Sequence, residues 1–167
     1  APMASPDPPP IPTAAVLLIG NELLSGKIRD QNGHALAKMM RRRGIRLLEV
    51  CTVEDDLASI GEALLRLLAR CPLVFTSGGV GPTHDDVTLE AVARALRRPL
   101  LRDPAMEQIL RDHFGARITP AALKMADLPE GTELTARHGW PVMRVSLARE
   151  RRIYILPGIP ELCLAKI

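Results

Sequence analysis

Two kinds of apolar pattern alternate along this chain, and their order constrains the fold more than any other feature of the sequence. A continuous apolar run typical of a strand buried in a parallel sheet covers residues 14–19, and further strands are predicted over residues 45–53 and 73–76. Apolar residues at helical spacing fall within residues 32–43, 57–68 and 88–96. Because strands and helices alternate, the sequence predicts an α/β fold with a mostly parallel central sheet.

Residues at the expected ends of these elements agree with this alternation. Gly44 is suited to follow a helix end, and Asp55 and Asp56 stand where a helix N-terminus favours negative charge. Thr88 is expected to cap the third helix through its hydroxyl. Further helices are predicted to begin at Asp103, Thr119 and Pro160, and further strands are predicted over residues 142–147 and 152–156.

The composition is that of one folded domain. Of the 167 residues, 47% are hydrophobic and 25% are charged, which excludes wholesale disorder and allows a core without disulfide bonds or a structural metal. Residues 1–12 are rich in proline, so we expect a flexible lead segment followed by one domain over residues 13–167. No apolar stretch is long enough for a membrane span and no secretory signal is recognised, so no membrane partner is expected.

Charge and cysteine content narrow the partners and the compartment. The net charge is +3 and aromatic residues make up only 2% of the chain, so a nucleic-acid partner is not expected. The three cysteines, Cys51, Cys71 and Cys163, are odd in number and lack C-x-x-C spacing, which argues against a disulfide framework and a zinc site. A reduced, cytoplasmic setting is therefore expected.

The loops that follow the predicted strands are the expected ligand site, because ligands of parallel sheets bind beyond the carboxyl ends of the strands. One of them, SGGVGPTHDDVT, places three glycines between a strand and a helix. Glycine N–H groups can approach a phosphate closely, and Asp85 and Asp86 supply the hard oxygen ligands that Mg²⁺ prefers. The loop is neither a Walker A sequence nor a dinucleotide fingerprint. The alternative is a tight turn in which His84 is solvated and both carboxylates serve the helix N-terminus.

The loop after the first strand offers many hydrogen-bonding groups over a short span. Asn21, Glu22, Ser25, Asp30 and Asn32 could orient a planar heterocycle such as a pterin or a nucleobase. The alternative is that Asp30 or Asn32 caps the following helix and that Glu22 is solvated.

Four segments in order resemble one known family. GNELLSGKIRDQN and TSGGVGPTHDDVTLEAVARAL, followed by LPEGTEL at 128–134 and ILPGIPE at 155–161, resemble the N-terminal domain of competence/damage-inducible protein CinA, within the molybdopterin-binding MoaB/Mog-like superfamily. The resemblance implies a three-layer α/β/α sandwich, often assembled as a homotrimer. It also implies a small anionic ligand, a nucleotide or pterin phosphate, at the glycine loop.

The resemblance also implies an activity. The CinA branch is associated with hydrolysis of ADP-ribose to AMP and ribose 5-phosphate, which predicts a metal-dependent pyrophosphatase that uses Mg²⁺, Mn²⁺ or Co²⁺. Asp85 and Asp86 are then the expected catalytic and metal-binding residues. The expected ligand-binding residues are Glu22, Ser25, Asp30, Asn32, Thr76, Ser77, Gly78, Gly79, Val80, Gly81, Thr83, Pro157 and Gly158.

Two alternatives remain open at this stage. One is a molybdopterin-binding protein of molybdenum cofactor biosynthesis, and the other is a non-catalytic binding or oligomerisation module. The segment 135–142 departs from the family pattern, because it lacks an expected Asn and carries Trp-Pro-Val where Ala-Pro-Gly is usual. CinA-like proteins normally continue into a further domain, and since this chain ends at Ile167 we expect no amidohydrolase activity on nicotinamide mononucleotide.

Overall fold

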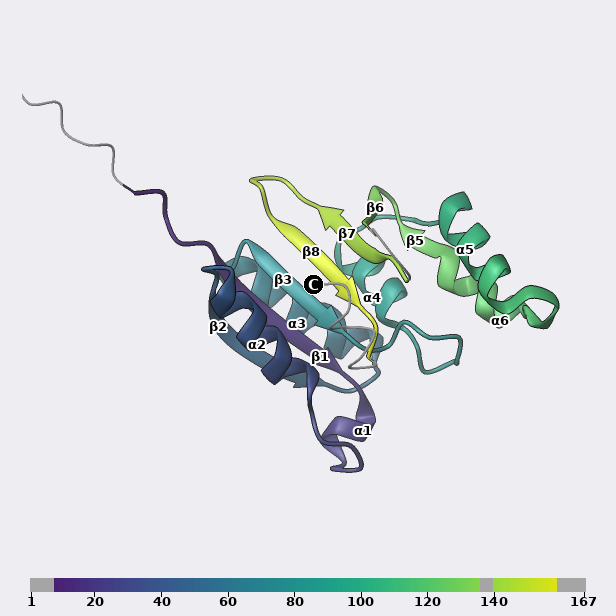
Figure 1. Cartoon of the computed structure of the whole chain (residues 1–167), viewed down its shortest axis with the longest axis horizontal. Helices are drawn as coiled ribbons and strands as arrows, with labels where there is room; N and C mark the ends of the chain where they lie inside the picture. Colours follow the sequence, from purple (N-terminus) through teal and green to yellow (C-terminus); the bar gives the residue numbers. More distant parts are fainter. Residues whose placement is uncertain (1–7, 136–139, 159–167) are drawn as a thin grey trace, which may run out of the picture.

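A six-stranded sheet organises the computed structural model, which describes residues 8–135 and 140–158 (Figure 1). Its strands are β1 (Thr13–Ile19), β2 (Arg46–Val53), β3 (Leu73–Ser77), β6 (Thr132–Thr135), β7 (Val142–Ser146) and β8 (Arg152–Leu156). The spatial order is β2-β1-β3-β8-β7-β6. The first four strands run parallel, and β7 and β6 continue the sheet in antiparallel pairing. The predicted mostly parallel sheet is therefore confirmed.

Strand β1 lies inside the sheet and shows why its sequence is continuously apolar. Successive side chains of a strand point to opposite faces, so a strand covered on both faces needs apolar residues at every position. Leu17 and Ile19 belong to the core cluster that includes the helix α3, whereas Val16 and Leu18 belong to the cluster that includes α2.

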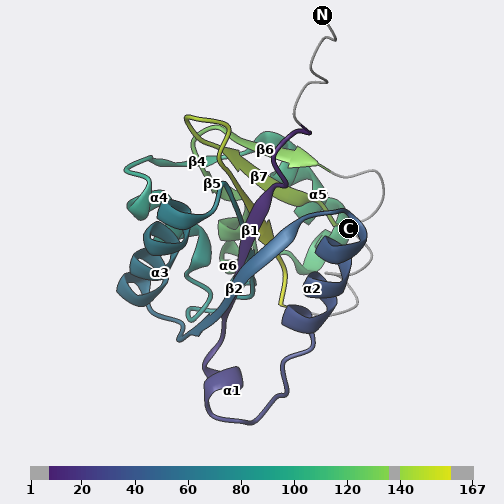
Figure 2. The ribbon, with the colours of Figure 1, turned by 90° about the vertical axis from the view of Figure 1, so that its left-hand side faces the viewer.

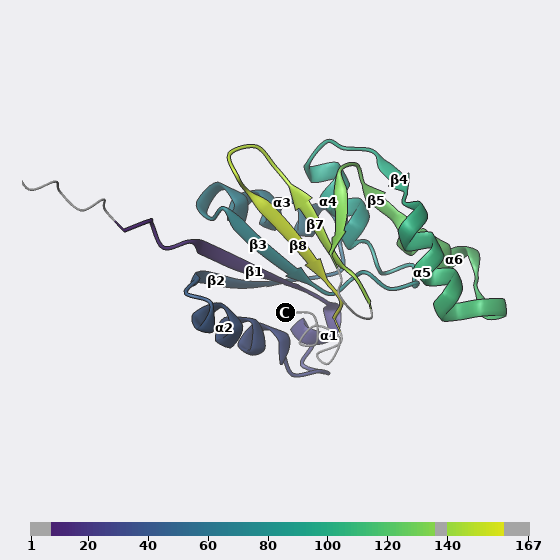
Figure 3. The ribbon, with the colours of Figure 1, turned by 45° about the horizontal axis from the view of Figure 1, so that its top comes forward.

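Helices cover both faces of the sheet and complete three layers. Figure 2 shows α3 (Leu57–Arg70) and α4 (Thr88–Ala95) on one side and α2 (Asn32–Arg42) on the other, and Figure 3 shows α2 below the same sheet. Leu64 and Leu67 of α3 are fully buried, as the helical spacing predicted. The predicted three-layer α/β/α sandwich is confirmed for the part of the chain that the structure describes.

Two predictions about helix ends were wrong at least in part. Asp56 caps α3, since its carboxylate accepts a hydrogen bond from the Ser59 N–H at 2.9 Å, but Asp55 faces elsewhere. Thr88 does not cap α4. It is fully buried within the first turn, and its hydroxyl donates to the Gly78 carbonyl at 2.8 Å because a buried hydroxyl needs a partner.

A small lobe formed by residues 100–129 was only partly predicted from the sequence. It contains the two-stranded ribbon β4 (Leu100–Arg102) and β5 (Asp127–Pro129), the helices α5 (Pro104–Phe114) and α6 (Pro120–Leu123), and the 3₁₀ turns η1 (Gly115–Arg117) and η2 (Lys124–Ala126). Asp103 and Thr119 cap the two helices as predicted. Figures 1 and 3 show α5 and α6 set to one side of the main sheet.

The remaining outcomes concern short or undescribed segments. The four-residue helix α1 (Asn21–Leu24) and the strands β4, β5 and β6 were not predicted. The helix predicted to begin at Pro160 and part of the unusual 135–142 segment lie outside the described residues. Within the described ranges, none of the helices has the length and apolar character needed to cross a membrane.

Candidate functional site

Three loops meet at the carboxyl ends of β1, β2 and β3 and enclose a cavity of about 450 Å³. Because these strands are parallel and adjacent, the loops that follow them leave the sheet at the same edge. The residues that line the cavity are Ile19, Asn21, Glu22, Ser25, Lys27, Asp55, Gly79, Thr83, Asp85 and Asp86. Four carboxylates and one lysine therefore share one space, which is chemistry suited to a cation together with an anionic ligand.

Asn21 and Asp55 join the first two loops by a pair of hydrogen bonds. The Asn21 N–H donates to Asp55 Oδ2 at 3.0 Å, and the Asp55 N–H donates to Asn21 Oδ1 at 3.1 Å. Burial raises the pKa of the Asp55 carboxyl, and the charges of Glu22, Asp86 and Asp85 raise it further, while the hydrogen bond from Asn21 opposes this. Electrostatic repulsion thus links all four carboxylates of the cavity.

The two aspartates of the glycine loop have different surroundings. Asp86 Oδ2 accepts hydrogen bonds from the Thr83 N–H at 2.9 Å and from the Thr83 hydroxyl at 2.7 Å, so this side chain closes a turn. The Asp85 side chain is 65% exposed, and its only partner in the described part of the chain is His84, whose Nε2 lies 3.2 Å from Asp85 Oδ1. Asp85 is therefore the freer of the two to bind an ion.

Gly78 has a role in packing, whereas the sequence analysis predicted that it binds phosphate. Its φ is +103°, and a Cβ at this position would collide with the Ile19 carbonyl oxygen. Its N–H donates to the Leu156 carbonyl at 3.2 Å. Gly78 thus allows β1, β3 and β8 to come together where they end, and its predicted role in binding phosphate stays a prediction.

The backbone N–H groups of the next three residues, 79–81, are placed so that they could bind a phosphate, as predicted. No hydrogen bond within residues 8–135 and 140–158 uses the N–H of Gly79, Val80 or Gly81. These groups precede α4, whose N-terminal dipole also favours an anion. A Cβ on Gly79, where φ is +68°, would collide with Thr88 Oγ1, so the loop needs glycine there, whereas a Cβ on Gly81 would lie 2.7 Å from Asp86 Oδ2 and would require that side chain to shift.

Several predicted ligand residues do not line the large cavity and instead form hydrogen bonds that hold the surrounding loops in place. Asn32 is buried, and its Nδ2 donates to Ser77 Oγ at 2.8 Å and to the Gly158 carbonyl at 3.0 Å. Ser77 Oγ in turn donates to the Pro157 carbonyl at 3.1 Å. These contacts join α2, β3 and the end of β8 beneath the site.

Asp30 and Thr76 are also placed away from the large cavity. Asp30 Oδ1 accepts from the Gly33 N–H at 2.9 Å, which is the capping alternative for this residue. The Thr76 hydroxyl is fully buried and has no partner in the described part of the chain. Of the ligand-binding predictions, Glu22, Ser25, Gly79 and Thr83 line the large cavity, and Asp85 and Asp86 line it as well.

Asp55 lines the cavity but was not among the site residues predicted from the sequence. It was assigned to a helix N-terminus because Asp56 and an apolar helix follow it. The missed signal was its place directly after a strand of the parallel sheet, which is the position that also selected Glu22. Lys27 lines the same cavity, but it does not directly follow a predicted strand, so its sequence position did not indicate a place in the site.

The carboxylates alone do not form a complete metal site. Within the described ranges, no three side chains of His, Cys, Asp or Glu lie close enough together to hold one ion. A cation at this place would need oxygen atoms from its ligand and from water, which is how Mg²⁺ is commonly held beside phosphates.

The comparison with protein families agrees with this geometry. A family model described as "Probable molybdopterin binding domain" matches residues 15–166. This chain belongs to that family. Within it the chain is of the CinA type, since a CinA-like protein from Syntrophus aciditrophicus is 40% identical over 149 residues, which are 87% of this chain and 36% of that protein. The chain thus spans little more than a third of that relative's length.

Solved structures support the same placement. The crystal structure of CinA from Thermoplasma acidophilum is 31% identical, with a TM-score of 0.86 and coverage of 92% of both chains. MoaB from Thermus thermophilus is 19% identical, with a TM-score of 0.60 and coverage of 91% of this chain and 84% of that one. The second similarity shows the fold alone.

Proposed function

We propose that this CinA-type domain hydrolyses the diphosphate bond of ADP-ribose with the help of a divalent cation. The observation that supports this most is the cavity lined by Glu22, Asp55, Asp85 and Asp86, beside a glycine loop whose N–H groups at residues 79–81 have no partner among the described residues. Carboxylates suit the cation, and N–H groups suit the phosphates, so both halves of the chemistry meet at one edge of the sheet.

The donor set fits a hard divalent cation such as Mg²⁺, Mn²⁺ or Co²⁺. Asp85 is exposed and weakly engaged, and Glu22 lines the same cavity, so these two carboxylates would hold the ion together with phosphate oxygens. Asp86 has one oxygen committed to Thr83 and would contribute through its charge and its other oxygen. When bound, such an ion would neutralise phosphate charge and lower the pKa of a coordinated water.

The chain's own residues would bind and orient the substrate. The N–H groups of Gly79, Val80 and Gly81, which bond to none of the described residues, would donate to phosphate oxygens, and Lys27 would offset part of the carboxylate charge. In the reaction, a water oxygen bonds to one phosphorus while the bond between that same phosphorus and the bridging oxygen breaks, so the bridging oxygen leaves with the other phosphorus. Two phosphate monoesters, AMP and ribose 5-phosphate, leave with the release of the two protons of that water.

Asp85→Asn is the sharpest test of this assignment. We expect a loss of AMP formation of at least about 100-fold with Mg²⁺, Mn²⁺ and Co²⁺, since charge that stabilises a transition state commonly contributes this much. Glu62→Gln, on the exposed side of α3 and outside the cavity, is the matched control and should keep wild-type turnover. An Asp85→Asn protein that releases AMP from ADP-ribose at the wild-type rate would contradict the proposal.

Asp86→Asn is the second variant, and it must be compared with a variant at Thr83 before its effect can be interpreted. Because Asp86 closes the turn through Thr83, its substitution changes loop structure as well as charge. Thr83→Val removes one of the same hydrogen bonds but keeps the carboxylate. If charge is what matters, Asp86→Asn should lose more turnover than Thr83→Val, and equal losses would indicate a structural role.

A molybdopterin-binding protein without hydrolytic activity is the second candidate. It is supported by the description of the matching family and by a cavity of about 450 Å³, which is in the size range of small-molecule sites. Calorimetry separates the two proposals. Tight binding of molybdopterin with no turnover of ADP-ribose in any metal would favour this second candidate, and a folded protein that binds neither would favour a non-catalytic module.

We also propose that the domain assembles as a homotrimer, as the family resemblance implies, and that it works in a reduced, cytoplasmic setting, as its cysteine content predicts. Sedimentation equilibrium at several protein concentrations tests the assembly directly. A mass equal to that of one chain at all concentrations would contradict it.

A further inference from the structure

Gly20, the residue that directly follows β1, has no conformational reason to be a glycine. Its φ is 163° and its ψ is 123°, an extended backbone outside the left-handed region in which glycine is favoured. Its N–H donates to the Val53 carbonyl at 3.1 Å, and its carbonyl accepts from the Leu23 N–H at 3.2 Å, as the backbone of other residues could also do. The space beside its Cα offers a reason instead.

That space is occupied by the carboxylate of Glu22. A Cβ added to Gly20 would collide with Glu22 Oε1, and it would lie 2.7 Å from Cδ and 2.8 Å from Oε2 of the same group. Non-bonded carbon atoms are best separated by about 3.5–4.0 Å, so the carboxylate could not keep this position beside a residue that has a side chain. Because Glu22 lines the large cavity, the place of its carboxylate there depends on Gly20.

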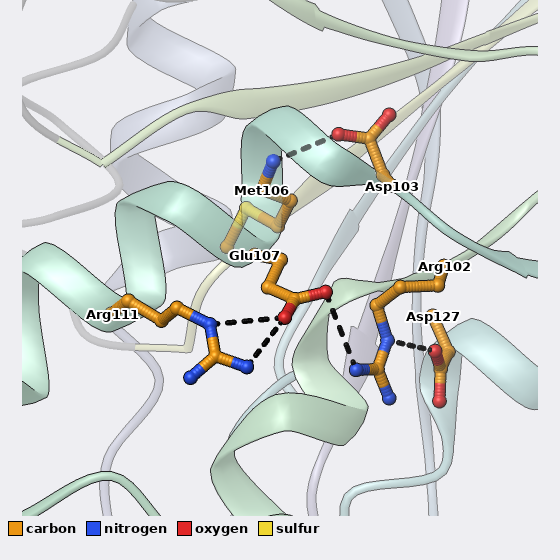
Figure 4. A network of polar contacts seen from close by, with 6 residues as sticks. All are labelled: Arg102, Asp103, Met106, Glu107, Arg111 and Asp127. Carbon is orange, nitrogen blue, oxygen red and sulfur yellow. Dashed lines mark hydrogen bonds and ion pairs between the residues drawn. The ribbon is translucent and has the colours of Figure 1, made fainter.

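The Glu22 carboxylate is not held by charge or by hydrogen bonds. It forms no hydrogen bond and no ion pair with any residue that the structure describes. Figure 4 shows a carboxylate that is held by such contacts in the lobe: Glu107 lies 3.5 Å from a nitrogen of Arg102 and 2.6 Å from one of Arg111. For Glu22, the open space at Gly20 takes the place of these partners.

Gly81 makes a similar approach to a carboxylate, but a side chain there would have a different effect. A Cβ on Gly81 would lie 2.7 Å from Asp86 Oδ2, an atom that already accepts two hydrogen bonds from Thr83. Displacing that carboxylate would therefore also disturb a turn. At Gly20, only the end of the flexible Glu22 side chain would have to move, so the position of a carboxylate can change while the fold is kept.

We propose that Gly20 is a positioning residue for Glu22. Because Gly20 lacks a side chain, the Glu22 carboxylate lies against the end of β1 and lines the large cavity, where it can bind a divalent cation together with phosphate oxygens. The inference rests on the proposed function for the presence of that cation. A methyl group at residue 20 would displace one ligand of the cation without changing the charge of the cavity.

Binding of Mn²⁺, measured from the electron paramagnetic resonance signal of the free ion, tests this role without turnover. The full chain is titrated alone and then with α,β-methylene ADP-ribose, whose P–C–P bridge resists hydrolysis. We expect Gly20→Ala to weaken Mn²⁺ binding about 10-fold to 100-fold, which is the usual effect of losing a group that orients a metal ligand. Gly61→Ala, on α3 and outside the cavity, is the matched control and should bind Mn²⁺ as wild type does.

Two further measurements separate positioning from a structural role. The double variant Gly20→Ala/Glu22→Gln should bind Mn²⁺ as Glu22→Gln alone does, because Gly20 acts only through that carboxylate. Gly20→Ala should unfold in urea at or above the wild-type midpoint, since an alanine at an extended position restricts the unfolded chain without straining the folded one.

Four results overturn the positioning role. They are equal Mn²⁺ affinities of Gly20→Ala and Gly61→Ala, a further weakening by Gly20→Ala in the Glu22→Gln protein, a urea midpoint of Gly20→Ala below that of wild type, and no Mn²⁺ binding to the wild type in either titration. The proposed reaction can fail separately. If ADP-ribose is not hydrolysed but Gly20→Ala weakens Mn²⁺ binding through Glu22, the positioning role holds and the reaction fails. If ADP-ribose is hydrolysed but Gly20→Ala binds Mn²⁺ normally, the reaction holds and the positioning role fails.

Discussion

Gly78→Ala is the substitution whose effect on stability follows most directly from the structure. An alanine at φ +103° occupies backbone space that residues with a Cβ rarely adopt, which costs about 1–3 kcal/mol. The added Cβ would also collide with the Ile19 carbonyl oxygen and lie 3.2 Å from its carbon, and such overpacking costs a further 1–3 kcal/mol, roughly. We therefore expect a loss of about 2–6 kcal/mol from a total that is typically about 5–15 kcal/mol.

Urea denaturation followed by circular dichroism measures this loss. With a slope of about 2 kcal/mol/M, a loss of about 4 kcal/mol lowers the midpoint by about 2 M. Two other glycines serve as matched controls. Gly26 has φ +77° and no atom within 4 Å of the added Cβ, so Gly26→Ala should show strain alone, about 1–2 kcal/mol. Gly61 is inside α3 with its nearest contact at 3.8 Å, so Gly61→Ala should stabilise by about 0.5–1 kcal/mol.

The comparison between these variants decides the role of Gly78. If Gly78→Ala were no less stable than Gly26→Ala, the contact with Ile19 would not constrain the fold, and the packing argument would be refuted. If Gly78→Ala kept wild-type stability but no longer bound pyrophosphate, the direct phosphate role predicted from the sequence would be supported.

Three further changes test individual contacts. The pKa of Asp55 is raised in the folded protein, so the folded state favours the protonated carboxyl. The resulting contribution to the free energy of unfolding is fully present below the ordinary pKa of 3.8 and is lost as the pH rises through the folded pKa. Asp55→Asn should therefore gain stability relative to wild type as the pH rises above about 4 in metal-free buffer, and a constant difference between the two proteins would contradict this. Asp56→Ala removes the cap of α3 and should cost about 1 kcal/mol in urea unfolding, whereas no change would mean that Ser59 finds another partner. Asn32→Ala leaves the Gly158 carbonyl without its amide donor and should cost about 1–3 kcal/mol, and a cost below about 0.5 kcal/mol would show that water replaces the side chain.

Local patterns predicted the main elements of the fold because each of them buries a continuous face. The run at β1 is apolar at every position since the strand is covered on both sides, and α3 repeats leucine at helical spacing because one face packs on the sheet. The short elements escaped prediction for the opposite reason. Strand β4 has three residues, all of them exposed, so its sequence carries no burial pattern to recognise.

The site was predicted in outline but not in its contacts. The glycine loop and Glu22 were found because they follow strands, and the structure places them at one edge of the sheet. Thr88 was assigned to a cap on local grounds, yet its burial made the Gly78 carbonyl its partner. Asp55 was assigned to a helix on the same grounds, yet it hydrogen-bonds with Asn21, which lies 34 residues away in the sequence.

The sequence by itself therefore determined the alternation of strands and helices, the edge of the sheet that carries the loops, and the residue types suited to a cation and a phosphate. These properties depend on spacing along the chain, which local sequence records. Only the tertiary structure decided which N–H groups of the glycine loop lack a partner among the described residues, that Gly78 serves packing, and that Asp55 lines the cavity beside this loop. Those outcomes depend on how closely segments distant in sequence approach one another, and that is set by the packing of the whole sheet and lobe.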